Sequence, residues 1–324
     1  MKTLFRRALM TAAIALAGAS VAQAADPFPT KPVRVIVTSA AGGLLDITTR
    51  LVARHMGDKL GQQVVVENRV GAGGLVAIRG MKTVPADGYT LMAAVNTVAI
   101  QQVSSLDPGY DLAKDFVGIG PMTYSPFVLV TGPDQPDKNL ADMIKRAKAN
   151  PGKLSYGSAG TGSTTHLAGA MFARAAGLNL LHVPYKGNAA AWPDVVSGRV
   201  GMIFEGYASG LSMMRDGRLK AIGVTSPKRM DVLPEVPTFI ETGVPDYTFN
   251  LWIGLLAPAG TPRDVVQKLS EALHAALNTP EVKDRFREQG SEVVLMSSDK
   301  FNQFLKDEVT GLTKLISDLG LPKQ

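Results

Sequence analysis

Two glycine-bearing turns hold the residues of this chain whose types and spacing could do chemistry. The first turn runs from Ser39 to Asp46, and the second turn runs from Ser158 to His166. Each turn follows a short apolar segment and precedes a segment with the spacing of an amphipathic helix. Glycine lets a ligand approach the backbone closely, and the free N–H groups at a helix start attract anions. The two turns are therefore predicted to bind a negatively charged ligand together.

A hydrolase interpretation of the second turn is not favoured. Ser158 lacks the G-x-S-x-G surroundings of a nucleophile elbow, because Tyr156 stands where the first glycine should be. His166 lies only three residues after Ser163 at a helix start, where the base of a catalytic triad need not be. A nucleotide site is not favoured either, because the phosphate-loop pattern lacks its lysine. We expect the chain not to be an enzyme.

Metal ions and cofactors are not expected in this chain. It contains no cysteine, which excludes thiolate metal ligands and thiol nucleophiles. The histidines outside the second turn lack the spacing of metal motifs such as H-E-x-x-H. We interpret them as ordinary core or surface groups: His55, His182 and His274.

The first 24 residues have the pattern of an export signal. Three basic residues precede an apolar stretch from Ala8 to Val21, and Ala22-Gln23-Ala24 predicts cleavage before Ala25. The apolar stretch is shorter than the roughly 20 residues that span a bilayer, although an uncleaved N-terminal anchor is the alternative. We expect an exported protein of the periplasm.

The remaining residues favour two lobes rather than a single core. Short strand-like segments alternate with helical patterns, which indicates an α/β fold with largely parallel sheets. Loss of the three basic residues of the signal lowers the formal charge from +6 to +3. The other basic residues are scattered, so no nucleic-acid partner is expected. The lobe boundaries are predicted as residues 25–125 plus 250–324 for lobe 1 and residues 126–249 for lobe 2.

The apolar pattern predicts the positions of strands and of two helix starts. A helix is expected from about Asp46, with one buried face made by Ile47, Leu51, Val52, Met56 and Leu60. Another is expected after Thr261, with that residue as its N-cap. Strands are expected at Val33–Val37, Val64–Val66, Tyr89–Ala94, Phe127–Val130, Leu154–Tyr156, Leu181–Val183, Val200–Phe204, Leu219–Val224, Thr248–Leu256 and Glu292–Leu295.

Nine short segments, in order along nearly the whole mature chain, carry a family resemblance. They resemble the Bug-type (Bordetella uptake gene) receptors, the extracytoplasmic solute-binding components of tripartite tricarboxylate transporters. The segments are Lys31-Pro32-Val33-Arg34, Val66-Glu67-Asn68-Arg69 with Gly71-Ala72-Gly73-Gly74, Pro85-Ala86-Asp87-Gly88-Tyr89-Thr90, Ala149-Asn150-Pro151-Gly152-Lys153-Leu154, Ser158-Ala159-Gly160-Thr161-Gly162-Ser163, His182-Val183-Pro184-Tyr185-Lys186-Gly187, Val224-Thr225-Ser226 with Lys228-Arg229, Leu233-Pro234-Glu235-Val236-Pro237-Thr238 and Ala257-Pro258-Ala259-Gly260-Thr261-Pro262.

The resemblance implies two Rossmann-like lobes of periplasmic binding protein type II architecture, with a ligand cleft between them. It implies a small organic carboxylate as ligand, membrane subunits of a tripartite tricarboxylate-type transporter as partners, and a monomer. A sensor for a membrane signalling partner is the alternative, and a periplasmic hydrolase a weaker one. The implied ligand-binding residues are Ser39, Ala41, Gly42, Gly43, Leu44, Asp46, Asn96, Thr97, Ser158, Gly160, Thr161, Gly162, Ser163, Thr164, His166, Tyr185 and Glu205.

The first turn departs from the family pattern. Leu44 and Leu45 replace small or polar residues, which favours a ligand with an apolar portion. Asp46 is interpreted either as a ligand-orienting group or as a helix cap, and both roles are compatible. Trp192 and Trp252 could stack on a ligand, but core or hinge packing is the favoured interpretation of each.

Overall fold

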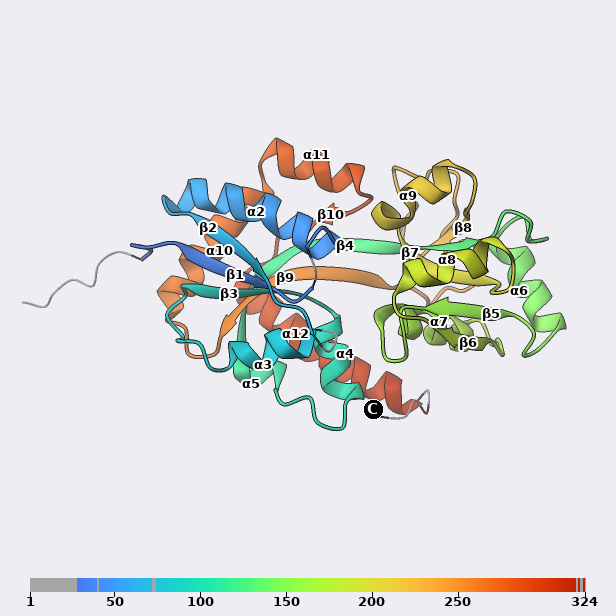
Figure 1. Ribbon diagram of the computed structural model, residues 1–324, viewed down its shortest axis with the longest axis horizontal. Helices are drawn as coiled ribbons and strands as arrows, with labels where there is room; N and C mark the ends of the chain where they lie inside the picture. The colour runs from blue at the N-terminus through green and yellow to red at the C-terminus, as the bar shows by residue number, and fades with distance from the viewer. Residues whose placement is uncertain (1–27, 40, 72–73, 319, 321–322, 324) are drawn as a thin grey trace, which may run out of the picture. The chain divides into compact units, whose positions relative to one another are not determined.

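The computed structural model describes residues 28–39, 41–71, 74–318, 320 and 323, and the export signal lies outside these residues. The chain divides into a short unit, Met1–Thr30, and a second compact unit, Lys31–Gln324, which holds all the elements below (Figure 1). None of the helices in the described part combines the length and hydropathy needed to cross a membrane.

In one part of the sheet, β2, β1 and β3 pair in parallel, and β9 lies between β3 and β4 and is antiparallel to both. The strands run in the order β2-β1-β3-β9-β4. Strand β1 lies inside this part of the sheet, and its residues from Val35 to Val37 are buried. Helices α2 and α10 cover one face, and α3, α4 and α12 cover the other (Figure 1). The bounds are β1 Val33–Val37, β2 Val64–Asn68, β3 Thr90–Val95, β4 Phe116–Thr131, β9 Asn250–Pro258, β10 Glu292–Val293, α2 Leu44–Leu60, α3 Leu75–Met81, α4 Thr97–Ser104, α5 Leu112–Asp115, α10 Arg263–Leu277, α11 Pro280–Glu288 and α12 Ser298–Asp318.

The other part of the sheet continues from β4 in the order β7-β5-β6, and β8 also pairs with β4. Its two faces are covered by different helix pairs, α6 with α7 and α8 with α9. Aromatic rings fill the core beneath α7, where Phe172 meets Phe239 edge-on at a centroid distance of 5.0 Å. The bounds are β5 Ser155–Ser158, β6 Leu181–Pro184, β7 Met202–Gly206, β8 Lys220–Val224, α6 Leu140–Ala149, α7 Thr164–Ala175, α8 Asn188–Val196 and α9 Tyr207–Arg215.

Strand β4 joins the two parts. It pairs with β9 as far as Pro126 and with β7 from Phe127 onward. The strand predicted at Phe127–Val130 is present as the last part of β4, which is longer than predicted because it begins at Phe116 and passes through Pro121. Register shifts near Gly118 and Pro121 absorb the residues that break a regular ladder. The lobe boundaries 25–125 plus 250–324 and 126–249 stay a prediction.

Two predicted helix details are wrong. Helix α2 begins at Leu44 rather than Asp46, and Ile47 is 45% exposed because the buried face is rotated toward Leu45 and Thr49. Helix α10 begins at Arg263 with Pro262 as N-cap, so Thr261 is not the cap. The Thr261 hydroxyl instead donates to the carbonyl oxygen of Pro258 at 2.8 Å, which closes the preceding turn.

Candidate functional site

The carboxyl ends of β1, β2 and β3 bring three polar residues to one edge of the sheet. Val37 pairs with Asn68 on one side and with Ala93 on the other, so the residues that follow the strands emerge together. Ser39 follows β1, Asn96 follows β3, and Asn68 ends β2. This is the edge at which ligands collect in open α/β sheets.

A buried carboxylate fixes the shape of the first turn. Asp46, 3% exposed, accepts hydrogen bonds from the Gly42 amide, Arg50 Nε and Asn68 Nδ2, each at 2.9 Å. Burial alone would raise the pKa of Asp46, but the hydrogen bonds from Arg50, Gly42 and Asn68 outweigh it and hold the pKa below its usual range. The N-cap of α2 is Gly43, so Asp46 braces the turn from inside the helix. Its contact with a ligand stays a prediction.

Two buried polar atoms at this edge have no hydrogen-bond partner among the described residues, and their contact with a ligand stays a prediction. Asn96 is 1% exposed, and its Nδ2 donates to the Asn250 carbonyl oxygen at 3.1 Å. Its Oδ1 and the hydroxyl oxygen of Ser39 are buried, and neither has a hydrogen-bond partner among the described residues. Buried polar atoms are normally paired, so an orphan acceptor next to a helix start marks a place for a ligand group.

The backbone and side chains of the first turn differ in exposure. No side chain in the described ranges caps the starts of α2 and α4, which leaves first-turn amides free for an anion. Leu45 is a core residue, whereas Leu44 is half-buried. The remaining backbone of the turn is exposed at Ala41, Gly42 and Gly43.

The second turn is closed by side chains that point back at its own backbone. The hydroxyl oxygen of Ser158 accepts from the Gly160 amide at 3.1 Å, and His166 Nδ1 accepts from the Gly162 amide at 3.1 Å. Ser163 caps α7 by accepting from the His166 amide. Ser158 is fully buried and His166 is buried, so both shape the turn, whereas Thr161 is exposed on it.

His182, interpreted from the sequence as an ordinary core or surface group, is half-buried in β6 and contacts this turn. Its Nε2 lies 2.7 Å from the hydroxyl oxygen of Ser158, and its ring stacks on His166 with the centroids 3.9 Å apart. The parallel pairing of β5 with β6 places Ser158 opposite Pro184 and Tyr156 opposite His182. The signal was present in the sequence, because His182 lies in a strand expected next to the one before the second turn.

Glu205 is held in a buried network that reaches the second turn. It is 2% exposed and accepts from Trp192 Nε1 at 2.9 Å, Asn188 Nδ2 at 3.2 Å, the Gly206 amide and the Ser209 hydroxyl. Burial raises the pKa of Glu205 in spite of these donors. The indole N–H of Trp192 is therefore used to hydrogen-bond the Glu205 carboxylate.

The network continues from Asn188 into the second turn. Thr165 donates to Asn188 Oδ1 at 3.2 Å and accepts from the Ala159 amide at 2.9 Å. The sequence prediction omitted both Asn188 and Thr165. Their contacts link Glu205 to the turn, so the carboxylate supports the backbone of the candidate site.

Tyr185 directs its hydroxyl away from the two turns. The hydroxyl donates to Asp194 Oδ2 of α8 at 2.5 Å. Burial and then the Asp194 carboxylate raise the pKa of Tyr185 to about 12. The backbone of Tyr185 lies closer to the site, because a Cβ atom on Gly160 would be 3.3 Å from its carbonyl oxygen.

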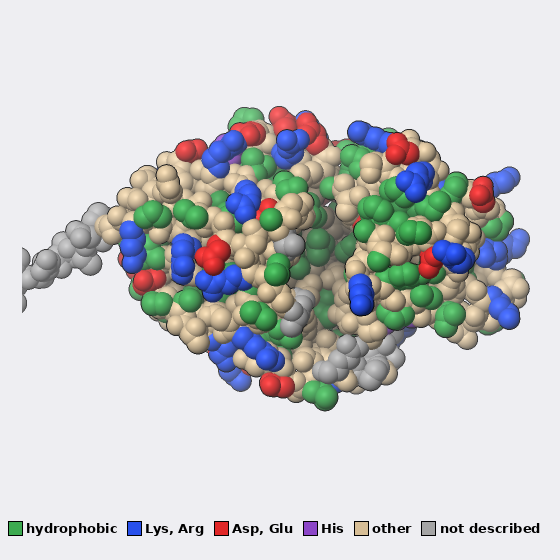
Figure 2. Space-filling model, in the orientation of Figure 1, with side chains coloured by type: hydrophobic (Ala, Val, Ile, Leu, Met, Phe, Trp, Pro, Cys, Tyr) green, Lys and Arg blue, Asp and Glu red, His purple; other side chains and the backbone are tan. Residues whose placement is uncertain are grey.

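The helix starts that follow β3 and β5 approach each other, so the second turn lies near Asn96 and Thr97. Thr97 Oγ1 at the start of α4 lies 3.3 Å from Thr164 Oγ1 at the start of α7. Leu167 of α7 packs into the core that α4 and α12 share, and Arg174 of α7 forms an ion pair with Asp318 of α12 at 3.1 Å. Figure 2 shows a hollow in the surface of the Lys31–Gln324 unit between its two sheet regions.

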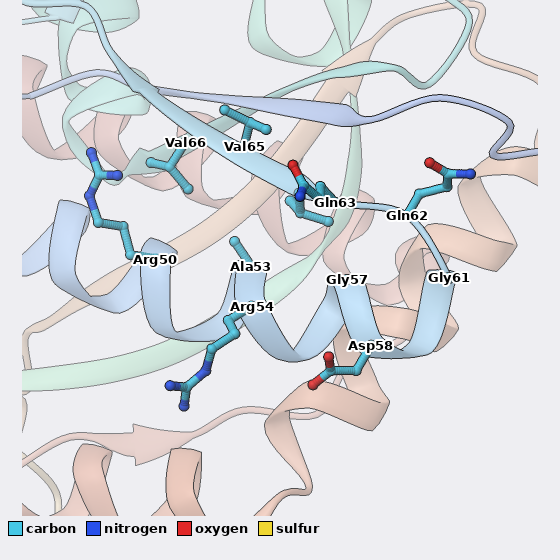
Figure 3. A pocket seen from close by; sticks show the side chains of 11 residues that line it. Arg50, Ala53, Arg54, Gly57, Asp58, Gly61, Gln62, Gln63, Val65 and Val66 are labelled. Carbon is cyan, nitrogen blue, oxygen red and sulfur yellow. The ribbon is translucent and has the colours of Figure 1, made fainter.

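A different cavity of about 660 Å³ lies between α2 and β2 (Figure 3). It is lined by Arg50, Arg54 and Val66 among others, and Arg54 and Asp58 point away from β2. None of the predicted ligand-binding residues lines it. The part of the chain that the structure describes also contains no group of three or more His, Cys, Asp or Glu residues that could hold a metal ion.

Solved structures share this fold over almost their whole length. A protein from R. palustris, solved with adipate, is 31% identical with a TM-score of 0.81, covering 90% of this chain and 98% of that one. MatC from Rhodopseudomonas palustris, with bound malate, is 28% identical with a TM-score of 0.76, covering 89% and 100%. The fold is thus the predicted one: two Rossmann-like lobes of periplasmic binding protein type II architecture. The chain is a solute-binding protein and not an enzyme.

The sequence comparisons identify the family. Residues 48–321 match the model of the tripartite tricarboxylate transporter family receptor, TctC. BugT from Bordetella pertussis is 32% identical, covering 95% of each chain. A protein encoded in the tcbD-tcbE intergenic region of Pseudomonas sp. strain P51 is 36% identical, covering 98% of this chain and 95% of that one. The chain therefore belongs to the TctC family of receptors, and the resemblance to Bug-type receptors is confirmed.

Proposed function

We propose that the chain is a periplasmic receptor that binds a small organic carboxylate between the first and second turns. The observation that carries this proposal is the 3.3 Å contact between Thr97 and Thr164. It brings the helix start after β3, at the same sheet edge as the first turn, next to the helix start of the second turn. Helix starts offer free N–H groups and partial positive charge, which favour an anion. The adipate and malate in the structures of two relatives agree with a carboxylate ligand.

The energetics favour contacts from both turns. Micromolar affinity needs about 8 kcal/mol. Each hydrogen bond to a carboxylate contributes about 1.5–3 kcal/mol, so five or six contacts give on the order of 10–15 kcal/mol. Association costs about 4 kcal/mol or more, so this sum reaches micromolar affinity only if nearly all of the contacts form and water is excluded. The ligand is therefore bound when the two turns close around it.

We further propose that the ligand has an apolar portion. Leu44 is half-buried at the start of α2, where it presents a hydrocarbon side chain beside the free first-turn amides. Leu45 does not contribute, because it is buried in the core. Acids with a hydrocarbon body, such as adipate, should bind more tightly than malate or citrate. Tighter binding of citrate or malate than of every apolar-bodied acid would refute this part of the proposal.

We propose that the loaded receptor, a monomer, delivers its ligand to the membrane subunits of a tripartite tricarboxylate-type transporter. The family match supports this role. A sensor for a membrane signalling partner would use the same binding site. Deletion of the protein separates the two roles, because a transport receptor is needed for uptake and a sensor for ligand-induced transcription.

A thermal-shift screen of about a hundred carboxylic acids tests the binding function. A ligand present at a hundred times its Kd adds about 2.7 kcal/mol to the free energy of unfolding, which raises Tm measurably. Calorimetric titration of the positive acids then gives their Kd values. If no acid in the panel raises Tm, the proposed carboxylate receptor is wrong.

A further inference from the structure

Two histidine rings lie face to face behind the second turn. His166 of α7 and His182 of β6 have ring centroids 3.9 Å apart and ring planes 17° apart. The other face of this pair is covered by Tyr156 of β5, whose ring stacks on His182 at 4.9 Å. The two imidazoles come from segments that are 16 positions apart in the chain, at the point where the second turn is anchored.

His166 closes the turn only as an uncharged ring. The Gly162 amide donates to its Nδ1 at 3.1 Å, so this nitrogen must keep its lone pair. A proton on Nδ1 would place two N–H donors against each other. Because the backbone of Gly162 has a positive φ of 75°, the glycine has the freedom to swing away when the contact is lost.

His182 anchors the beginning of the same turn. Its Nε2 lies 2.7 Å from the hydroxyl oxygen of Ser158, which accepts from the Gly160 amide and donates to the Gly160 carbonyl oxygen at 3.1 Å each. Because the Ser158 proton is used in this way, Nε2 of His182 is the donor, and a second proton on His182 acts on the turn as an unpaired charge stacked on His166 rather than by breaking this bond. Burial lowers the pKa of His166, and burial together with the neighbouring His166 lowers the pKa of His182 to about 4. Both rings are therefore uncharged near neutral pH.

No neighbouring group offsets a charge on either ring. In the described ranges, neither His166 nor His182 forms an ion pair, and no carboxylate contributes to the pKa shift of either ring. Elements packed against α7 and β6 carry these titratable groups: Tyr156, Glu205 within its own network, Tyr247 with its hydroxyl on the Ala168 carbonyl oxygen, and the Arg174–Asp318 pair at the far end of α7.

We propose that His166 and His182 are positioning residues that hold the second turn in its ligand-binding form only while both rings are uncharged, so that protonation opens the turn and releases the ligand. This inference rests on the proposed function of the turn. It makes ligand retention depend on external pH, since the periplasm follows the acidity of the surroundings. The protein would hold its ligand at neutral pH and lose affinity in acid.

Binding of adipate by calorimetry at pH 7.5 and pH 5.0 tests the proposal in three proteins. These are the wild type, the double variant H166N/H182Q, and the control H274Q. His274 lies on α10, and its Nε2 hydrogen-bonds the carbonyl oxygen of Met296. Asn and Gln keep hydrogen-bonding atoms near Nδ1 and Nε2 but cannot be protonated in this range. Each Kd at pH 5.0 is divided by the same protein's Kd at pH 7.5. Protonation of adipate itself changes this ratio equally in all three proteins, so it cancels when the ratios are compared.

The wild type and H274Q are expected to lose about tenfold more affinity than the double variant. If a ring has a pKa of about 4 in the closed turn and about 6.5 in an opened one, its protonation at pH 5.0 can raise Kd by roughly 30-fold at most. Equal Kd ratios in all three proteins would overturn the inference while leaving the carboxylate receptor intact. Failure of adipate to bind at pH 7.5 would count against the proposed function instead.

A second measurement decides the inference without a ligand and without a variant. In an NMR titration of the wild-type protein, the amide signals of Gly160 and Gly162 should shift with the same midpoint as the rings of His166 and His182. Amide signals that stay unchanged while the rings become protonated would overturn the inference, because the turn would then be independent of their charge.

Discussion

Gly169 lies in the middle of α7, where the helix packs against β5. A Cβ atom there would lie 2.1 Å from Cε2 and 2.4 Å from Cδ2 of Tyr156. The Tyr156 ring is buried and has His182 stacked at 4.9 Å, so it has little room to move. Overpacking costs about 1–3 kcal/mol, whereas replacing a helical glycine by alanine gains about 0.5–1 kcal/mol. Because the clash is severe, Gly169→Ala should lower the free energy of unfolding by about 2 kcal/mol.

Gly311 in α12 provides the matched control, because a Cβ atom there meets nothing within 4 Å. Gly311→Ala should stabilise the protein by about 0.5–1 kcal/mol through helix propensity alone. Urea unfolding at equal m value, supported by Tm, measures both variants. The Gly169 variant should also bind adipate more weakly, since a displaced Tyr156 ring pushes His182 against the second turn. If both alanines stabilise the protein alike, the packing of Tyr156 described here is incorrect.

Three further substitutions test the assignment of the site. Thr164→Val should weaken adipate binding by about tenfold, because one hydrogen bond to a charged group is lost. Thr310→Val on the exposed face of α12 is its control. Equal Kd values for the two variants would place Thr164 outside the site. Tyr185→Phe should change Kd by less than about twofold, because the Tyr185 hydroxyl donates its hydrogen bond to Asp194. A large loss of affinity measured by calorimetry would show that this hydroxyl reaches the ligand. Asp46→Asn should lower the free energy of unfolding by about 2 kcal/mol, and with it Tm and the affinity for adipate, because an amide cannot accept from all three donors. An unchanged Tm would show that the carboxylate does not hold the first turn.

The sequence predicted correctly those strands and helices whose formation depends on residues close together in the chain. The strand before each turn and the helix after it could be predicted, because apolar spacing and glycine act over a few positions. The first half of β4 could not, since Gly118, Gly120 and Pro121 are typical of a loop, and their strand conformation depends on pairing with β9. The helix phase at Ile47 was wrong because the buried face of α2 runs through Leu45 and Thr49.

The candidate site was predicted as two turns with some of the side chains that support them, such as Asp46 and His166. Other supporting side chains, such as His182 and Asn68, were not predicted. His182 contacts Ser158 across 24 positions, and Asn68 contacts Ser39 across 29. No local pattern reports such contacts, because they arise from the parallel registers of β5 with β6 and β1 with β2. Family resemblance identified the turns, whereas the three-dimensional structure identifies what keeps them in shape.

The two turns are held by groups that are needed in different charge states. All of these groups take up a proton as pH falls, but they do so in different pH ranges. The charged form of Asp46 supports the first turn, so its contribution is present above the ordinary carboxyl pKa and is lost only as pH falls through the lowered one. The uncharged forms of His166 and His182 support the second turn. Their contribution is complete above about pH 6.5 and is lost as pH falls toward the lowered values, about 4 for His182. Between these limits Asp46 stays charged, so mild acid should loosen the second turn while the first keeps its shape, and release should begin on that side of the ligand.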